Sequence, residues 1–237
     1  MNRAIQILFR PFQYLIIGIV DLIYPPLCLL CEERLEVDED QICPTCLGSF
    51  KLMGTEHTAF SVPGELYIHT AWAMFDFDKQ VKSLVHHLKY SNRRKPVIKL
   101  LHTFESDVME LLPKAGYDLI IPIPLHPRKL RERGYNQVAD MAEWVAPRVG
   151  GKVPEKLVTR SRYTSTQTQL NAEERQANVR GAFKVREGGY LIDKRVLIVD
   201  DVVTTGATAN TLAAVLLENG AKRIDLLTLS TPQLSDA

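Results

Sequence analysis

The sequence predicts an α/β protein: a parallel, twisted sheet with helices on both faces, preceded by a small cysteine-rich module. Three observations lead to this fold class. From residue 70 onward, apolar strand patterns alternate with helical patterns, which is typical of a parallel sheet covered on both faces. All four cysteines lie between residues 28 and 46. One wholly apolar segment, Val196–Val199, runs directly into two aspartates and a threonine-rich turn.

The composition is that of an ordinary globular protein. The 237 residues are 46% hydrophobic and 24% charged, enough for one large or two smaller domains. A net charge of +1 excludes a protein that coats nucleic acid uniformly by bulk charge. The charges are nevertheless uneven: residues 79–99 hold seven Lys or Arg and no acid, and residues 128–133 hold four against one glutamate. Such segments indicate either an anionic ligand or solvated helix faces, and both interpretations stay open.

Residues 1–24 are predicted to form an apolar helical extension. Its most apolar stretch, Pro11–Val20, has ten residues, too few to span a bilayer. No signal-peptide cleavage site follows it. We therefore expect a cytoplasmic protein without a transmembrane span. Packing of this helix on the rest of the protein or on a partner is favoured, and association with the inner face of the membrane is the alternative.

The cysteines form two pairs, Cys28-x-x-Cys31 and Cys43-x-x-Cys46. Two neighbouring turns of this kind point four thiolates at one tetrahedral ion. The pattern predicts a zinc finger over residues 25–50, with a structural Zn²⁺ because four thiolates leave no position open for a substrate. Unmetallated or redox-active thiols are the alternative. Disulfides would need an exported protein.

Residues 66–237 are expected to form the main domain. Its strands are expected at residues 70–77, 119–123, 157–159, 196–199 and 224–229. Its helices are expected at residues 79–90, 97–112, 136–149 and 208–218, with a short helix beginning at Asn171. The first helix shows the pattern most clearly, because Val81, Leu84, Val85 and Leu88 recur at helical spacing.

The segment VLIVDDVVTTGAT, residues 196–208, carries the most specific chemistry. Parallel sheets bind ligands at the carboxyl ends of their strands, where this strand places Asp200 and Asp201. The turn Thr204–Thr208 then opens a helix, and its backbone amides and hydroxyls suit a phosphate dianion. Neighbouring carboxylates suit sugar hydroxyls or a hydrated metal ion. The glycine patterns of P-loops and dinucleotide-binding proteins are absent from the sequence.

This segment resembles the phosphoribosyl pyrophosphate (PRPP) loop of the type I phosphoribosyltransferases. The resemblance implies that the two aspartates hold the ribose hydroxyls, that the turn binds the 5′-phosphate and that Mg²⁺ accompanies PRPP. The PRPP-binding residues implied are Asp200, Asp201, Val203, Thr204, Thr205, Gly206, Ala207 and Thr208.

Residues 21–230 are similar to the ComF (ComFC) competence family, phosphoribosyltransferase-like proteins with an N-terminal four-cysteine zinc finger. The similarity includes the cysteine pairs. The other motifs that carry it are Pro122-Ile123-Pro124-Leu125-His126, Arg133-Gly134-Tyr135-Asn136-Gln137, and Gln167, Leu170, Arg175, Asn178 and Phe183.

Two further loops follow from this similarity. The basic loop after strand 119–123 is the counterpart of the pyrophosphate loop, since Arg side chains can hold pyrophosphate bidentately. Its candidate residues are His126, Arg128, Arg133, Gly134 and Asn136, with Arg133 favoured and His126 more typical of a loop hydrogen-bonder than of a catalyst. The polar segment 161–169 is either a flexible loop that closes over the ligand or an ordinary surface loop. Its candidate residues are Tyr163, Thr164 and Gln167.

The ComF resemblance favours a PRPP-binding protein of DNA uptake and natural transformation. Such a protein would handle single-stranded DNA beside a ComFA-type, ATP-dependent import motor. The alternative is an active phosphoribosyltransferase of nucleotide salvage that uses PRPP, Mg²⁺ and an unidentified base or amine; no catalytic residue can be assigned. Stacking by Tyr135 and Tyr163 would suit DNA, whereas Trp72 is expected in the core. The DNA-binding candidates are Lys89, Tyr90, Arg93, Arg94 and Lys95.

Overall fold

The computed structural model describes residues 25–36, 39, 41–53, 65–90, 95–112, 116–161, 181–186 and 188–232. The chain divides into two compact units, Met1–Ser49 and Phe50–Ala237. The apolar extension predicted for residues 1–24 and the short helix predicted at Asn171 lie outside the described residues.

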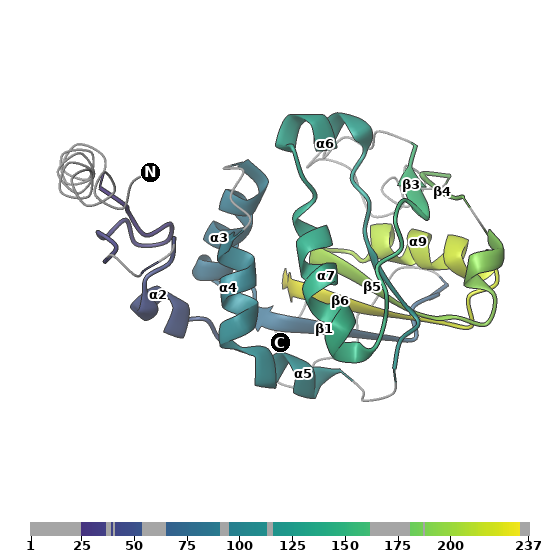
Figure 1. Ribbon diagram of the computed structural model, residues 1–237, viewed down its shortest axis with the longest axis horizontal. Coiled ribbons are helices and arrows are strands. Elements are labelled where there is room, and N and C mark those ends of the chain that lie inside the picture. Colours follow the sequence, from purple (N-terminus) through teal and green to yellow (C-terminus); the bar gives the residue numbers. More distant parts are fainter. Residues whose placement is uncertain are drawn as a thin grey trace, which may run out of the picture. The chain divides into compact units, whose positions relative to one another are not determined.

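The second unit is built on a parallel four-stranded sheet in the order β1-β6-β5-β2 (Figure 1). The strands are β1 Thr70–Asp76, β2 Leu119–Pro122, β5 Arg195–Val202 and β6 Arg223–Thr231. Val196 to Val199 are fully buried in β5, as expected for a central strand covered on both faces. The predicted parallel sheet is confirmed.

Helices cover both faces of this sheet, which is also confirmed. On one face, α7 Gln137–Val149 packs against β2 and β5, α5 Glu105–Leu111 packs against β1, and α4 Lys95–Thr103 packs against α3 Lys79–Tyr90 and α7. On the other face, α9 Ala207–Glu218 contacts β5 and β6. Its Leu212, Ala213 and Leu216 share one buried cluster with Val196 and Ile198. Burial on both faces favours the continuous apolar strands seen in the sequence.

The single helix predicted over residues 97–112 is wrong, because the chain forms α4 and α5 with a break at Phe104. Phe104 has a non-helical backbone, with φ −107° and ψ 27°. Its ring packs edge-on against Phe75 of β1, with the ring centroids 5.3 Å apart. This packing of an aromatic ring against the sheet accompanies the bend, and it is a tertiary contact that no local pattern shows.

The strand predicted near residues 157–159 exists but does not join the parallel sheet. It is β3 Val158–Arg160, and it pairs antiparallel with β4 Phe183–Val185, a strand that the sequence did not predict. A 3₁₀ helix, η1 Gly188–Leu191, then leads toward β5. The short β3–β4 pair lacks the long apolar run that makes a central strand recognisable.

The basic segment after β2 is a helix, α6 Pro127–Arg133, where a loop was expected. His126 caps its start, since its Nδ1 accepts a hydrogen bond from the Arg128 amide at 3.1 Å. Pro127 occupies the first helical position, which its fixed φ favours. Gly134 ends the helix in the left-handed conformation, with φ 75°, a common glycine C-cap. Pro127 and Gly134 therefore mark the two ends of a short helix.

Candidate functional site

The two neighbouring aspartates lie on β5 itself, because this strand continues to Val202. Asp200 is in register with Thr228 of β6, and Val202 is in register with Ser230. Successive side chains of a strand point to opposite faces of the sheet. The two side chains have different surroundings, since Asp200 lines a cavity and Asp201 is bound by Gln137 and Lys89, although the sequence suggested an equivalent pair at the start of a loop.

A small cavity of about 50 Å³ lies at the carboxyl end of β5, lined by Asp200 and residues 202–209. Gly206 begins α9 with φ 70°, a conformation that glycine adopts without strain. Val203 anchors the loop: its amide donates to the Ser230 carbonyl at 3.2 Å, and its carbonyl accepts from the Thr231 hydroxyl at 2.7 Å. The loop thus ends at a helix N-terminus, where the macrodipole and the backbone amides of the first turn favour an anion.

Asp201 lies on the α7 side of the sheet, and its carboxylate is engaged by protein groups. Its Oδ2 accepts from Gln137 Nε2 at 2.8 Å and pairs with Lys89 Nζ at 3.1 Å. Its Oδ1 accepts from the Val202 amide at 2.7 Å. Burial alone would raise the pKa of Asp201, but the Lys89 charge and the hydrogen bonds from Gln137 and Val202 hold it below its usual range. Asp201 is therefore ionised.

Asp200 is the aspartate that faces the cavity. Its Oδ1 accepts from the Asp201 amide at 2.8 Å. Burial, and then the negative charge of Asp201, raise the pKa of Asp200 well above its usual range. Because a carboxyl in this state gains most from a cation or from hydroxyl partners, Asp200 is the better placed of the two to meet a ligand.

The residues predicted as a pyrophosphate loop divide into helix caps and basic side chains. His126 and Gly134 cap α6, as described above. The Asn136 side chain caps α7 by accepting from the Val138 amide, and it donates to the Ile123 carbonyl at 3.0 Å. Arg128 is exposed and pairs with Glu132 at 3.0 Å. Arg133 donates a long hydrogen bond of 3.5 Å to Gln137 Oε1, and Gln137 is itself bound to Asp201.

Two basic residues that are not among the site candidates named from the sequence interact with the charges around the aspartates. Burial, followed by the positive charges of Arg160, Arg133 and Lys89, lowers the pKa of Lys129. Burial likewise lowers the pKa of Arg160, and the Asp200 carboxylate opposes that shift. Positive side chains from α3, α6 and β3 thus interact electrostatically around the aspartates. Lys129 stood out only as part of a basic run, and Arg160 carried no motif at all.

The DNA-binding candidates differ in exposure and in their partners. Lys95 is exposed at the start of α4, while Lys89 is paired with Asp201. Stacking by Tyr135 is wrong, because its ring is only 3% exposed and its hydroxyl donates to the Leu88 carbonyl at 2.7 Å. The core position of Trp72 is confirmed, at 8% exposure. Tyr90 ends α3, but its side chain lies outside the described part of the chain, as do the other candidates, Arg93, Arg94, Tyr163, Thr164 and Gln167.

The four cysteines gather at one centre in the first unit. Their Sγ atoms all lie within 4.8 Å of one another, and Cys31 and Cys43 are 3.8 Å apart. Four thiolates bound to one Zn²⁺ at about 2.3 Å would lie about 3.8 Å from each other, so the sulfurs fit this ion. Cys43 caps the short helix α2 Pro44–Gly48, its Sγ accepting from the Cys46 amide at 3.4 Å. Burial raises the pKa of Cys28, but hydrogen bonds from backbone amides, first that of Cys43, lower this pKa to about 7.

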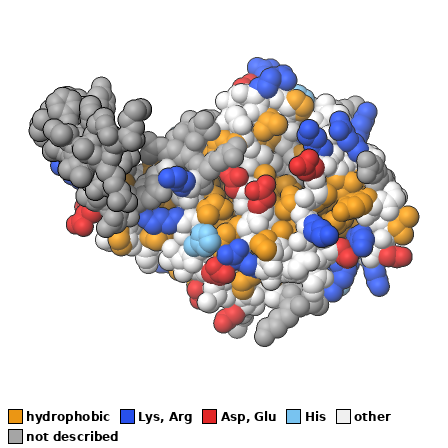
Figure 2. All heavy atoms as spheres, in the orientation of Figure 1, with side chains coloured by type: hydrophobic (Ala, Val, Ile, Leu, Met, Phe, Trp, Pro, Cys, Tyr) orange, Lys and Arg blue, Asp and Glu red, His pale blue; other side chains and the backbone are white. Residues whose placement is uncertain are grey.

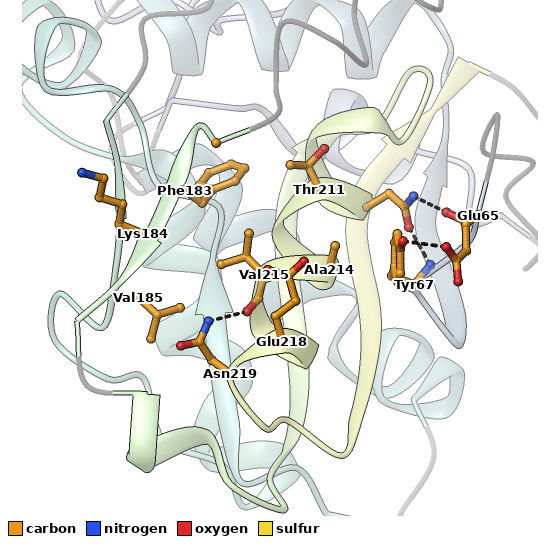
Figure 3. A pocket seen from close by; sticks show the side chains of 12 residues that line it. Glu65, Tyr67, Phe183, Lys184, Val185, Thr211, Ala214, Val215, Glu218 and Asn219 are labelled. Carbon is orange, nitrogen blue, oxygen red and sulfur yellow. Dashed lines mark hydrogen bonds between the residues drawn. The ribbon is translucent and has the colours of Figure 1, made fainter.

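A second, larger cavity of about 930 Å³ lies along α9. Figure 3 shows Phe183 and Val185 of β4 along one side of the helix and Tyr67 on the other. Among the described residues that line it there is neither aspartate of β5 and no residue of the Thr204–Thr208 loop. The larger cavity is therefore separate from the Thr204–Thr208 loop, which lines the small cavity.

Comparisons with known proteins identify the class of each part. Residues 139–233 match the phosphoribosyl transferase domain, and residues 19–57 match the double zinc ribbon domain. The first match contains β5, its aspartates and the loop before α9; the second contains all four cysteines. The second unit is thus a phosphoribosyltransferase-like α/β domain, and the four-cysteine centre supports a structural zinc.

Full-length relatives then point to a particular family. The chain is 28% identical over 221 residues to the DNA utilization protein YhgH of Salmonella typhimurium, covering 85% of this chain and 95% of that protein. It is 24% identical over 218 residues to Competence protein F of Haemophilus influenzae, covering 84% and 94%. It is 26% identical over 228 residues to Competence protein ComFC of Streptococcus pneumoniae, covering 85% and 98%. The resemblance to the ComF (ComFC) family is confirmed.

Within the described residues, no helix combines the length and the apolar character needed to cross a membrane.

Proposed function

We propose that this chain binds PRPP at the carboxyl end of β5 and serves DNA uptake by handling incoming single-stranded DNA. The observation that carries the proposal is the cavity that Asp200 shares with the Thr204–Thr208 loop. It joins a carboxylate for hydroxyls or a cation to a helix N-terminus for a phosphate, the two chemistries that a phosphorylated sugar requires.

Each part of PRPP has a partner in this proposal. The 5′-phosphate binds in the small cavity, against the amides and hydroxyls of the Thr204–Thr208 loop. Asp200 binds the ribose hydroxyls, and Asp201 follows it on β5. The pyrophosphate lies toward Lys129, Arg133 and Arg160, whose positive charges interact around the aspartates. Arg forks bind such oxygens bidentately.

Mg²⁺ with PRPP fits the donor set. Carboxylate oxygens are hard ligands of the kind that Mg²⁺ binds in combination with substrate phosphates. Asp200 would be the protein ligand nearest the loop, since it lines the cavity that the loop forms. When bound, the ion neutralises negative charge on the pyrophosphate.

The biological part of the proposal rests on the relatives, which are named for DNA utilization and competence. Those names favour DNA uptake over nucleotide salvage. Single-stranded DNA and a ComFA-type import motor are the proposed partners. The proposed location is the cytoplasm, with residues 1–24 as the segment that would contact the inner face of the membrane.

Calorimetry with PRPP, with and without Mg²⁺, tests the ligand. The wild-type chain should bind PRPP only with Mg²⁺, and Asp200→Asn should weaken binding by about tenfold or more, since it removes a charge-assisted partner. Asp107→Asn is the matched control, because Asp107 is an exposed acid on α5. Equal affinity of Asp200→Asn and Asp107→Asn would refute the site.

A pyrophosphate-release assay over bases and amines separates the two candidate functions. Release that depends on one acceptor would establish the salvage-type transferase. Tight PRPP binding without release for any acceptor would support the DNA-uptake function.

A further inference from the structure

Lys89 reaches the candidate site from an element outside the PRPP motif. It lies in the last turn of α3, and its Nζ is 3.1 Å from Asp201 Oδ2. The lysine side chain is 28% exposed, whereas that of Asp201 is 10% exposed. The ion pair therefore stands at the edge of the site, with one partner held inside and the other able to reach solvent.

This contact occupies Asp201. Oδ2 meets two donors, Gln137 Nε2 and Lys89 Nζ, which matches its two lone pairs. Oδ1 accepts from the Val202 amide. While Lys89 is in place, Oδ2 has no position left for a ribose hydroxyl or a metal ion. A ligand that uses Oδ2 of Asp201 must displace one of its two donors, Gln137 Nε2 or Lys89 Nζ.

Lys89 is the donor that can leave. Gln137 is 1% exposed on α7, and the Val202 amide belongs to the strand. Lys89 ends in a compact single charge on a flexible four-carbon stem, and it lies near enough to Lys129 for their like charges to interact unfavourably. A divalent cation at the same distance from the carboxylate would gain twice the Coulomb energy of the ammonium group.

We propose that Lys89 is an internal counter-ion of Asp201, that a divalent cation replaces it, and that the released ammonium then binds a phosphate group. The inference rests on the proposed function, because it describes how the same aspartates accept Mg²⁺. Replacement frees the charge of Lys89, which already interacts with that of Lys129. Because the cation then neutralises the Asp201 carboxylate, the local charge becomes more positive. Cation binding and phosphate binding therefore favour each other, as linkage requires in both directions.

Calorimetric titration of the full chain with Mg²⁺ alone tests whether Lys89 competes with a divalent cation for Asp201. Lys89→Gln should bind Mg²⁺ at least about fivefold more tightly than the wild type, the lower end of typical coupling between sites. Lys79→Gln is the matched control, because it removes the same charge from the exposed first residue of the same helix. Equal Mg²⁺ affinity of the two variants, or no detectable binding by either, overturns the proposal.

The source of the phosphate group is decided by two further titrations at constant ionic strength. If PRPP supplies it, Lys89→Gln should bind PRPP more weakly than Lys79→Gln at saturating Mg²⁺. If DNA supplies it, Mg²⁺ should strengthen binding of a thymidine oligonucleotide by the wild type and not by Lys89→Gln. No effect of Lys89→Gln in either titration overturns the release step. Failure of the wild type to bind PRPP would instead refute the proposed function. The Mg²⁺ titration would still test whether Lys89 is the counter-ion of Asp201.

The variant Lys89→Gln leaves a largely buried carboxylate without its cation, which lowers stability. The double variant Lys89→Gln/Asp201→Asn removes both charges and controls for this. It should melt close to the wild type and lose the gain in Mg²⁺ affinity. If the double variant kept that gain, the counter-ion proposal would be wrong.

Discussion

At the scale of single residues, Gly206 fixes the shape of the loop that we propose to bind phosphate. Its φ of 70° lies in the left-handed region, which costs other residues about 1–2 kcal/mol. We predict that Gly206→Ala lowers the free energy of unfolding by about 1–2 kcal/mol and weakens PRPP binding, because the loop amides turn away from the phosphate.

Thermal denaturation and calorimetry on the same samples measure both effects. Gly189→Ala is the control, since Gly189 has no positive φ and a Cβ added there meets nothing within 4 Å. The prediction fails if Gly206→Ala melts and binds PRPP as Gly189→Ala does.

The chemical identity of the candidate site could be predicted from the sequence, because strand, aspartates and loop are contiguous. The difference between Asp200 and Asp201 could not. It arises from partners on other elements: Gln137 is 64 positions away from Asp201, and Lys89 had been assigned to DNA. No local pattern encodes which residue of a strand faces which helix. The cavity-facing position of Asp200 therefore needed the fold.

At the scale of elements, α3 was predicted with its observed limits and α6 was not predicted at all. Helix α3 repeats apolar residues at helical spacing over three turns, and this signal is strong. Helix α6 has no buried residue, so no apolar periodicity marks it, and it depends on its caps and on the Arg128–Glu132 pair. A short helix without a buried face is therefore easily mistaken for a basic loop.

The basic start of α4 leads to a prediction for single-stranded DNA. If Lys95 contacts phosphates, the affinity for a thymidine oligonucleotide should fall steeply with salt. The slope of log affinity against log salt should decrease by about 0.7 in Lys95→Ala, as expected for the loss of one contact.

Fluorescence titrations between low and physiological salt measure this slope. Lys79→Ala, at the far end of the basic segment, provides the comparison. A slope that Lys95→Ala leaves unchanged would remove this lysine from the DNA surface.

At the scale of the whole molecule, the near-zero net charge is a balance of separate groups. On the face shown in Figure 2, Lys and Arg side chains form several small groups with acidic side chains between them. The net charge alone excludes a protein that coats nucleic acid uniformly. The arrangement of the charges on this face agrees with that conclusion. The sequence could not show that two of the acids are partnered or buried at the candidate site, since total charge says nothing of position.

The division into two compact units predicts separate responses to metal removal. Displacement of the thiolates by a mercurial should release about one zinc per chain and should unfold the residues around the cysteines. Amides of β5 should stay protected from hydrogen exchange, because their hydrogen bonds lie within the second unit.

Zinc-indicator absorbance and residue-resolved exchange follow the two units independently. Cys28→Ser should lose the metal, whereas Thr45→Ala, an exposed change in α2, should retain it. A fully folded, metal-free protein would contradict the structural role of zinc.

The different partners of Asp200 and Asp201 have an evolutionary consequence. The two neighbouring aspartates are therefore under different selective constraints. Position 200 is constrained by the loop that follows it, whereas position 201 is constrained by its partners at positions 89 and 137. Substitutions at positions 89, 137 and 201 are therefore expected to co-vary among descendants of this protein. Position 200 is expected to be inherited together with the glycine and threonines beside it.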